Sequence, residues 1–506
     1  MKKYIKIVVL GVLIIFNYTS CSDEFTVVDP IGLINEDDFL TTDAEAESVI
    51  YGIYDLMAWN YNRPWNSAFV LKVLAGDIAN AGSTTGDQPP LQQLDDFIHV
   101  ADNPAITGVW EGFYKTIGLA NVLIEKLEVS ELASKDKFIA EAKFLRAYSY
   151  LELVTMFGDV PLRITTPKSI DEFGLARSSK SDVYAQIEND LAVAINGLPT
   201  KGAIGEPFRI SKEAAQAVLG KVYLFQEKYD LAAIEFETVI SSMAFDLEPN
   251  FADVWSSSSE NGIESLIEIN YVSTEKYDWG NFPWGGRPES NIHAQLMGPR
   301  GDAFDVAAIG IANGWGFNIP TAKIGAAFNN AGDVIRKNAT LISEADLITA
   351  GGAVTPPDAG IHDYEGYVRL KYVTKTEDTD GPINELNYGI NWRLLRYADV
   401  LLMAAEAYHK NNEDPKALIE LNKVRDRAGL ADVTVTGTAL FDAIVLERQL
   451  ELAFEGQRFW DLVRWGLADT ELSSFGYTSK NQVFPVPSNE ISRNVLINPE
   501  DQNPGY

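Results

Sequence analysis

Apolar residues recur at intervals of three and four over long stretches of the first half of the chain, a pattern typical of amphipathic helices. Asp43 can cap the first of these helices, and Pro104 opens the second, where its missing N–H costs nothing. Gly158 and Pro199 mark the ends of two more, because glycine tolerates the left-handed conformation and proline cannot continue a helix. The predicted helices cover about residues 43–57, 104–123, 134–157 and 181–198.

A repeat pattern follows these helices. Leu219-Gly220-x-x-Tyr223, with Ala232 and Phe236 behind it, fits the tetratricopeptide spacing. Small Gly220 and Ala232 let two antiparallel helices approach, and the two aromatic rings fill the groove between them. Because such pairs bury their faces only against neighbours, we expect other helices to complete a stack. The same offsets recur much later, at Ala405, Tyr408, Ala417 and Leu421.

Residues 244–392 separate the two pairs and have a different composition, rich in Gly, Asn, Pro and Trp, with brief strand-like runs at 265–272 and 366–373. We therefore predict a mainly α fold, a tetratricopeptide-like helical-pair scaffold with a large loop-rich insertion that contains short β-strands. A single domain should span residues 41–506. Its scaffold would comprise about 41–243 and 393–470, and its loop-rich region about 244–392.

The N-terminus is typical of a targeting segment. Three early lysines precede an apolar run, Ile7–Phe16, which is too short to span a bilayer comfortably. Small residues then lead to Cys21, as at a lipoprotein cleavage site, although Tyr18 stands where leucine is usual. We predict a signal peptide at 1–20, lipidation of Cys21 and a tether at 21–40; secretion with an incidental cysteine is the alternative. The chain would then be anchored to a membrane and not embedded in it.

The composition of the chain argues against several kinds of partner and site. The formal net charge of −31 makes nucleic acid an unfavourable partner, because the phosphate backbone is itself anionic. The only cysteine is Cys21, so the mature chain has no internal disulfide, and the four histidines show no paired spacing for zinc. Asp378-Thr379-Asp380 resembles the start of a calcium loop but lacks the later ligands. We predict no metal and no cofactor.

Several longer segments resemble the signatures of one family, the SusD/RagB family, and they occur in family order from the leader to the last residue. Together they cover most of the chain, whereas any one alone would be weak. The segments are Glu141–Tyr150 with Phe157–Pro161, Trp392–Ala407, Leu421–Gly429, Glu447–Arg464, Phe484–Pro487 and Gln502–Tyr506.

The resemblance implies a role that periodicity and composition do not show. Members of this family bind oligosaccharides at the cell surface and sit on a TonB-dependent outer-membrane transporter. The chain is thus expected to be a non-enzymatic, lipid-anchored protein of the outer membrane. Acidic Ser22-Asp23-Glu24, just behind Cys21, resembles the surface-export signal of Bacteroidetes lipoproteins.

One cluster of carboxylates offers an enzymatic alternative. Glu447, Glu451 and Glu455 follow each other at four-residue spacing, with arginines nearby. They can be interpreted as glycosidase carboxylates or as a salt-bridged helix face with buried packing contacts, and we favour the second interpretation. Arg393, Arg396 and Asp399 are interpreted in the same way.

Sugar binding needs flat apolar surfaces, because pyranose rings present C–H faces that pack on aromatic rings. Trp65, in Trp59–Asn66, and the pair Trp279 and Trp284 lie in segments with neither helical nor strand periodicity. Trp315, in Asn-Gly-Trp-Gly, is a third candidate. The alternative for each is a ring that plugs its loop onto the scaffold, since tryptophan is largely buried on average. By contrast, Trp110, Trp460 and Trp465 occur in helical patterns and are assigned to the core.

Residues 76–88 form a turn-rich segment whose family counterpart borders the ligand site. Asp77 and Asn80 are therefore predicted to contact sugar hydroxyls, with turn capping as the alternative. The acidity of the chain favours a neutral sugar, for example a β-glucan of the laminarin type. A glycoside hydrolase on a helical scaffold and a peptide-binding tetratricopeptide protein remain the two rival functions.

Overall fold

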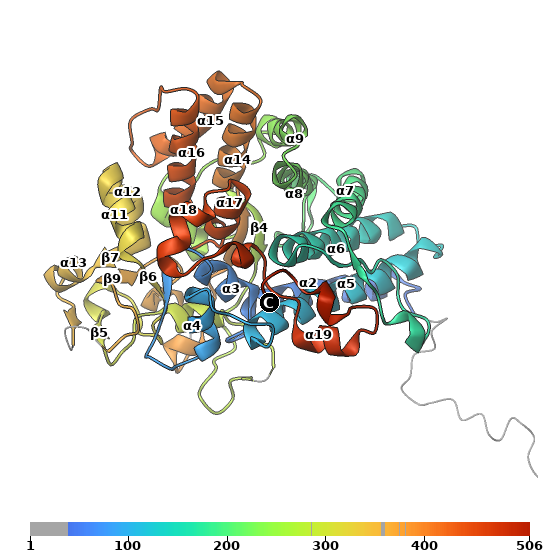
Figure 1. Ribbon diagram of the computed structural model, residues 1–506, viewed down its shortest axis with the longest axis horizontal. Helices are drawn as coiled ribbons and strands as arrows, with labels where there is room; N and C mark the ends of the chain where they lie inside the picture. The colour runs from blue at the N-terminus through green and yellow to red at the C-terminus, as the bar shows by residue number, and fades with distance from the viewer. Residues whose placement is uncertain (1–38, 285, 356–359, 374, 380) are drawn as a thin grey trace, which may run out of the picture.

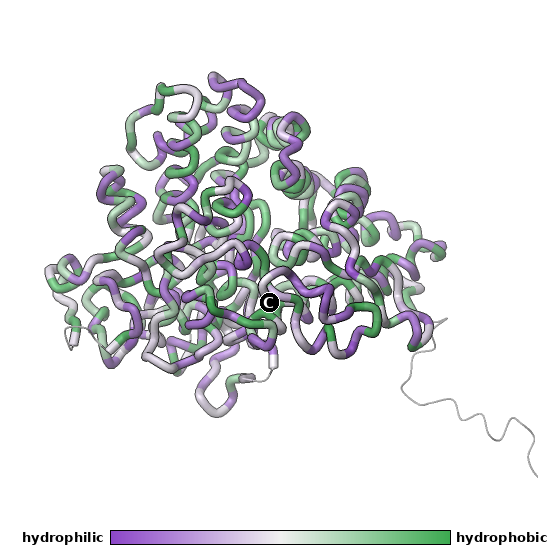
Figure 2. The backbone as a smooth tube through the Cα atoms, in the orientation of Figure 1, coloured by the Kyte–Doolittle hydropathy of each residue, from purple (hydrophilic) through white to green (hydrophobic). Residues whose placement is uncertain are grey.

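The structure, a computed structural model, describes residues 39–284, 286–355, 360–373, 375–379 and 381–506. Helices dominate it (Figure 1), and along them hydrophobic residues alternate with hydrophilic ones (Figure 2). The larger helices are α2 (Asp43–Asn62), α5 (Pro104–Glu128), α6 (Lys135–Phe157), α7 (Lys180–Gly197), α8 (Lys212–Phe225), α9 (Tyr229–Ser241), α14 (Tyr397–Lys410), α15 (Asp414–Arg427) and α16 (Thr438–Glu451).

These helices form one continuous stack in which each packs on the next, from α2 and α5 through α8 and α9 to α14, α15 and α16. The predicted helical-pair scaffold is confirmed. Gly220 shows why the first pair packs so closely: a Cβ at this position would lie 2.6 Å from the ring of Phe236. The first helix is capped by Thr42 and Glu45 in a capping box, so the prediction of Asp43 as its cap was wrong.

The region between the two halves of the scaffold holds loops and short strands, as predicted. It also holds short helices of six to ten residues, which were not predicted because so few turns leave no clear periodicity. These helices are α10 (Ile292–Met297), α11 (Ala322–Ala331), α12 (Val334–Thr340) and α13 (Glu344–Thr349).

Strands in the described part of the chain occur in two-stranded antiparallel pairs. The pair β10–β4 joins the second half of the scaffold to the insertion, and β1–β6 joins the insertion to the segment that follows α2. The pairs are β1 (Ala79–Gly82) with β6 (Phe317–Pro320), β4 (Ser265–Ile269) with β10 (Trp392–Arg396), β2 (Val160–Pro161) with β3 (Arg177–Ser178), β5 (Phe304–Asp305) with β8 (Ala353–Val354), and β7 (Leu341–Ser343) with β9 (Tyr367–Arg369).

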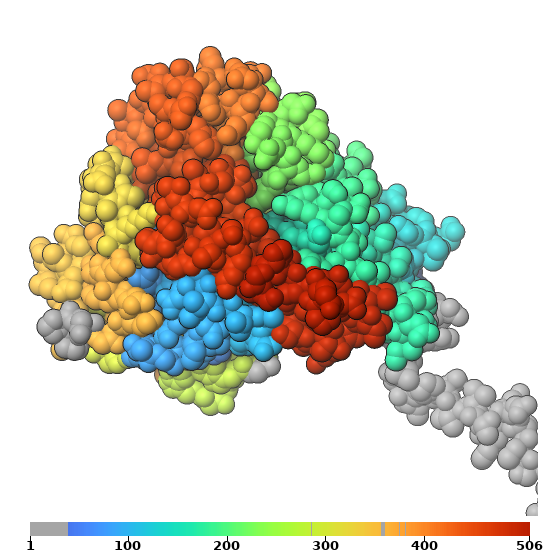
Figure 3. Space-filling view, viewed as in Figure 1, coloured from blue at the N-terminus to red at the C-terminus, as the bar shows by residue number. Residues whose placement is uncertain are grey.

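Short helices complete the molecule. The C-terminal ones lie across the front of the scaffold in Figure 3, over the segment that follows α2. None of the described helices is long and apolar enough to cross a bilayer. The short helices are α3 (Ala68–Leu74), α4 (Pro89–Asp95), α17 (Arg458–Arg464), α18 (Ala468–Leu472) and α19 (Ser488–Arg493).

Candidate functional site

Four tryptophans from three separate segments form one row of stacked rings. Trp65 stacks on Trp315 with ring centroids 5.5 Å apart, Trp315 on Trp284 at 5.8 Å, and Trp284 on Trp279 at 6.2 Å. The angles between successive ring planes are 15°, 10° and 6°, so the rings are nearly parallel. We call Trp65, Trp315, Trp284 and Trp279 the tryptophan row. The structure thus brings together the four tryptophans singled out in the sequence.

Trp65 is held in an unusual backbone conformation between α2 and α3. Its φ is +51°, in the left-handed region that a bulky residue rarely occupies. Arg63 leaves the helical conformation immediately before Pro64, as a residue preceding proline tends to do, and Ser67 caps α3 directly after the turn. Strained backbone of this kind is concentrated at functional sites, which favours a functional role for the indole ring.

Glycines fix Trp315 from both sides. A Cβ on Gly314 would lie 2.2 Å from the carbonyl oxygen of Gln295, and one on Gly316 would lie 2.5 Å from Cγ of Arg300. This close approach lets the backbone N–H of Trp315 donate to the Gln295 carbonyl at 3.0 Å. The backbone of Trp315 is therefore fastened to α10.

Trp279 and Trp284 lie on a loop that projects from the body of the molecule, the yellow-green loop below it in Figure 1. The turn is closed by its own contacts, since the carboxylate of Asp278 accepts from the backbone N–H of Gly280 and of Asn281 at 2.7 and 3.0 Å. The two rings remain exposed, Trp279 by 50% and Trp284 by 41%. Large apolar surfaces exposed in this way are typical of binding sites.

The stacking decides which ring surfaces are free. Trp315 has Trp65 on one side and Trp284 on the other, and Trp284 lies between Trp315 and Trp279. Trp279 ends the row, with a neighbour in the row on one side only, and its side chain is 50% exposed. A chain of sugar rings can contact such a row along its length.

Asn66 follows Trp65 in the sequence, and its amide lies against α5. It is half-buried, and its side chain makes no hydrogen bond within the described part of the chain. Gly108 of α5 makes room for it, because a Cβ there would lie 2.7 Å from Nδ2 of Asn66. A free amide can both donate to and accept from sugar hydroxyls. Its position next to Trp65 in an Asn-rich segment was the only sequence signal.

Asp77 is buried away from solvent. Its two carboxylate oxygens accept from Nε and Nη2 of Arg458 at 3.0 Å each, and Lys323 Nζ lies 2.8 Å from one of them. Burial alone would raise the pKa of Asp77, but Arg458 and Lys323 outweigh it and hold this pKa below its usual value. The side chain is therefore committed to contacts within the fold, and we leave it out of the proposed site.

Asn80 is also committed to internal partners. It lies in β1, in a segment predicted to be rich in turns, and is 5% exposed. Its Nδ2 donates to the carbonyl oxygen of Asp363 at 2.7 Å and to Oε1 of Glu365 at 3.1 Å. These bonds tie β1 to the insertion, so Asn80 too is left out of the proposed site.

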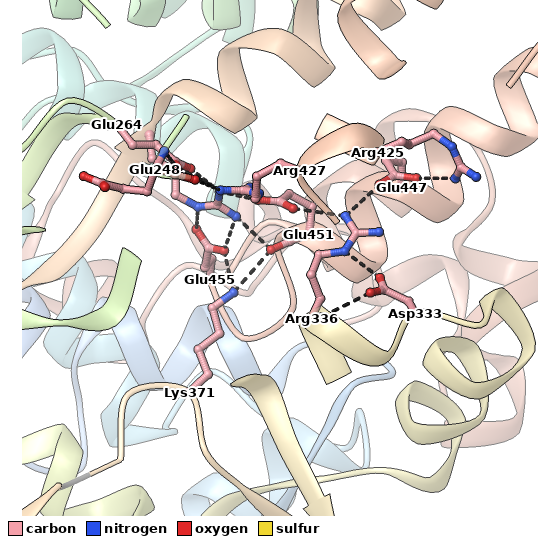
Figure 4. Close-up of polar contacts among 11 residues, drawn as sticks. Glu248, Glu264, Asp333, Arg336, Lys371, Arg425, Arg427, Glu447, Glu451 and Glu455 are labelled. Atoms are coloured by element: carbon pink, nitrogen blue, oxygen red, sulfur yellow. Dashed lines mark hydrogen bonds and ion pairs between the residues drawn. The ribbon is translucent and has the colours of Figure 1, made fainter. Parts of the chain in front are cut away.

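The carboxylates that resemble a glycosidase pair are ion-paired in the interior (Figure 4). Glu451 is fully buried and contacts Arg396, Arg427 and Arg336. Burial would raise its pKa, but the three guanidinium groups hold the pKa of Glu451 far below its usual value. Glu455 accepts from Arg396 and from Lys371 at 2.8 and 2.7 Å.

Glu447 completes this cluster, with Nη1 of Arg336 at 2.6 Å and Nη1 of Arg425 at 2.8 Å. Arg336 belongs to α12 and Glu447 to α16, so the ion pairs bind the insertion to the scaffold. We call the whole group the buried ion cluster. The interpretation of these glutamates as salt-bridged packing residues is confirmed, as it is for Arg396 and for Asp399, which pairs with Arg448 at 2.7 Å.

The described residues contain no group of three or more His, Cys, Asp or Glu side chains placed to hold a metal ion. Asp378 accepts from the hydroxyl of Ser257 at 3.2 Å, while Asp380 lies outside the described residues. Cys21 and the predicted signal peptide also lie outside them. Of the tryptophans assigned to the core, Trp110 and Trp460 are buried and Trp465 is half-buried.

Comparison with known families identifies two matching regions. The family model described as "SusD family" matches residues 338–482, and the one described as "Starch-binding associating with outer membrane" matches residues 35–224. The first covers the second half of the scaffold with Glu447, Glu451 and Glu455 of the buried ion cluster, and the second covers Trp65 and most of the first half.

Individual proteins match over the whole length. The chain is 28% identical to SusD-like protein P2 of Formosa agariphila, with all of both chains covered. A solved structure titled "Laminarin binding SusD-like protein" is 32% identical, with a TM-score of 0.82 over 92% of this chain and 100% of that one. Surface glycan-binding protein A from Bacteroides fluxus is 25% identical, with a TM-score of 0.79 and the same coverage.

Proposed function

This chain belongs to the SusD family, and from that premise we propose that it captures oligosaccharides cut from a polysaccharide and passes them to a TonB-dependent outer-membrane transporter. The protein is held at the cell surface by lipid on Cys21. It binds its ligand without cleaving it. The match to the family described as "Starch-binding associating with outer membrane" supports this location, and family resemblance supports the transporter as the partner.

The tryptophan row is the observation that carries the proposal. Its rings come from three segments, two of them fixed by strained or glycine-flanked backbone, and its outer end is half exposed. Packing does not require an exposed row of this kind. Sugars pack their C–H faces on such rings, and the amide of Asn66, the neighbour of Trp65 in the sequence, can bind a hydroxyl.

The proposed ligand is a neutral β-glucan of the laminarin type. A relative with 32% identity is named as a laminarin binder, which favours this glucan over other neutral chains. The net charge of −31 disfavours a polyanionic polysaccharide, since the field of the whole protein would repel it.

The buried ion cluster supports binding without catalysis. An inverting or retaining glycosidase needs two carboxyl groups that face the scissile bond. Glu447, Glu451 and Glu455 are buried and paired with cations, so none of them faces a ligand.

A panel of oligosaccharides tests the function directly. The mature protein should retain laminari-oligosaccharides on a column and leave them uncut after prolonged incubation. Cleavage products would establish the hydrolase, and retention of peptides in place of any glycan would establish the peptide-binding alternative.

The anchor and the partner have separate tests. Cys21→Ala should release the protein from the membrane fraction, and continued partition with outer membranes would contradict lipidation. The lipidated protein should co-purify in mild detergent with one large outer-membrane β-barrel. Recovery as a free lipoprotein in several detergents would contradict the transporter assignment.

A further inference from the structure

A group of exposed apolar side chains gathers at one end of the molecule, far from the tryptophan row in sequence. We call it the apolar end patch. Two segments contribute, one between α6 and α7 and the other directly after α19. The exposed fractions are 42% for Ile164, 84% for Ile170, 67% for Phe173, 85% for Val495 and 51% for Leu496.

The two segments are bound to each other. Nδ2 of Asn494 donates to the carbonyl oxygen of Leu175 at 2.9 Å, and the N–H of Leu175 donates back to the Asn494 side chain at 3.1 Å. A Cβ on Gly174 would lie 3.4 Å from Val495 and 3.5 Å from Leu496. Figure 3 shows the two segments side by side at the lower right. The patch is therefore one surface.

This surface lies at the end where the folded domain begins. Glu125, near the end of α5, accepts from the N–H of Thr166 at 2.6 Å and pairs with Lys168 at 3.2 Å. Lys126, the next residue of α5, and the segment 129–133 after the helix line the same hollow as Phe39 and Leu40. The sequence places seventeen residues between Cys21 and Phe39, a span of at most about 60 Å.

The charge around the patch differs from that of the whole chain. Residues 163–177 and 490–501, which Arg177 joins through its bond to the carbonyl oxygen of Asp501, contain four basic and five acidic side chains, whereas the chain has 41 basic and 72 acidic ones. Lys168, 70% exposed, and the exposed Arg493 lie in the two segments of the patch. The patch is thus close to electrically neutral, and an anionic surface is repelled less here than by the rest of the protein.

The apolar side chains belong to irregular segments and one short 3-10 helix, and three of them, at positions 170, 173 and 495, are more than three-fifths exposed. Projecting tips with cationic neighbours fit the boundary between lipid headgroups and acyl chains, where apolar groups leave water and cations approach phosphates. We propose that the apolar end patch rests on the outer leaflet of the membrane that holds the lipid anchor. This inference rests on the lipid-anchor part of the proposed function.

An environment-sensitive label tests it in the lipidated, full mature chain. Because Cys21 is the only cysteine and is blocked by lipid, Val495→Cys gives a single site for a nitrobenzoxadiazole label. Met243→Cys, at a position 88% exposed beyond α9, is the matched control. Both proteins are reconstituted on vesicles of phosphatidylethanolamine and phosphatidylglycerol, with and without brominated acyl chains.

The label at position 495 should shift its emission to the blue and be quenched by brominated lipid, while the label at 243 should do neither. Exchanging both Ile170 and Phe173 for Ser should weaken the shift. If the protein binds the vesicles but the emission of the label at 495 stays as it is in water, the inference is wrong and the lipid anchor is unaffected. Failure to float with vesicles would overturn the anchor as well. A blue shift seen only in native outer membranes, without lipid quenching, would mean that the patch faces a protein, and would also overturn it.

Discussion

The buried ion cluster and the tryptophan row both stand out as groups able to carry chemistry, but the structure gives them opposite environments. Glu451 is fully buried with three arginines around it, whereas Trp279 has half its surface in water. In the first group every carboxylate is used to hold the insertion on the scaffold. In the second, part of the ring surface remains exposed to solvent. Charged and aromatic side chains thus indicate a ligand site only where the fold leaves them exposed and without partners of their own.

The largest expected effect is on the ion cluster. Glu451→Ala leaves Arg396, Arg427 and Arg336 without this partner in the interior, so it should lower the free energy of unfolding by about 3–5 kcal/mol. Denaturant titration measures this. Glu413→Ala, which removes a surface pair with Lys416, should leave stability nearly unchanged. Equal effects of the two changes would contradict the central role of the cluster.

Trp465 provides a comparison among the tryptophans. Its Nε1 donates to Glu406 at 2.8 Å, and it lies on the scaffold, half-buried. Trp465→Ala should lower the free energy of unfolding by about 2–4 kcal/mol, somewhat less than for a fully buried ring, and leave glycan affinity unchanged. Thermal unfolding paired with a binding titration checks both. A loss of glycan affinity in the variant that remains folded would contradict the assignment of Trp465 to the core.

Acid should act on the cluster and not on the row. Because the folded-state pKa of Glu451 is depressed, its contribution is present above the unfolded pKa of about 4.3 and is lost as the pH falls below it. As the pH falls below that value, the free energy of unfolding of the parent should decrease by about 1.4 kcal/mol per pH unit more than that of Glu451→Gln. Parallel stability–pH curves for the two proteins would show that this linkage is absent.

The smallest expected effect concerns the backbone of Trp65. Because its φ is +51°, glycine should suit this position better than alanine. Trp65→Gly should therefore be more stable than Trp65→Ala by about 1 kcal/mol, while both lose the same glycan affinity. Chemical unfolding of the two variants measures the difference. A more stable alanine variant would show that the turn relaxes without strain.

Much of the scaffold could be predicted from the sequence because long helices repeat their apolar positions many times. Gly158 and Pro199 mark helix ends for simple steric reasons, and the offset from Gly220 to Phe236 predicts one close helix pair. The short helices of the insertion could not be predicted, because a helix of so few turns shows no clear apolar periodicity. Packing on the rest of the protein determines where these helices form.

The candidate site could be predicted only in part. Tryptophans in loops without periodicity indicate the right residue type, and all four meet in one row. Their order in the row depends on three segments far apart in the sequence. Asp77 shows the limit, since a polar residue in a turn-rich segment gives no sign of partners nearly four hundred residues away, such as Arg458.

Calorimetric titration with laminarihexaose of the parent and of Trp65→Ala, Trp279→Ala and Trp284→Ala tests the central claim most directly. If sugar rings pack on the row, each change should cost about 1–3 kcal/mol of binding, or roughly 5- to 150-fold in affinity. Trp279→Ala and Trp284→Ala should do so with little change in melting temperature, because their rings are half exposed. Variants that bind like the parent while melting several degrees lower would show that the row only packs the loop onto the protein.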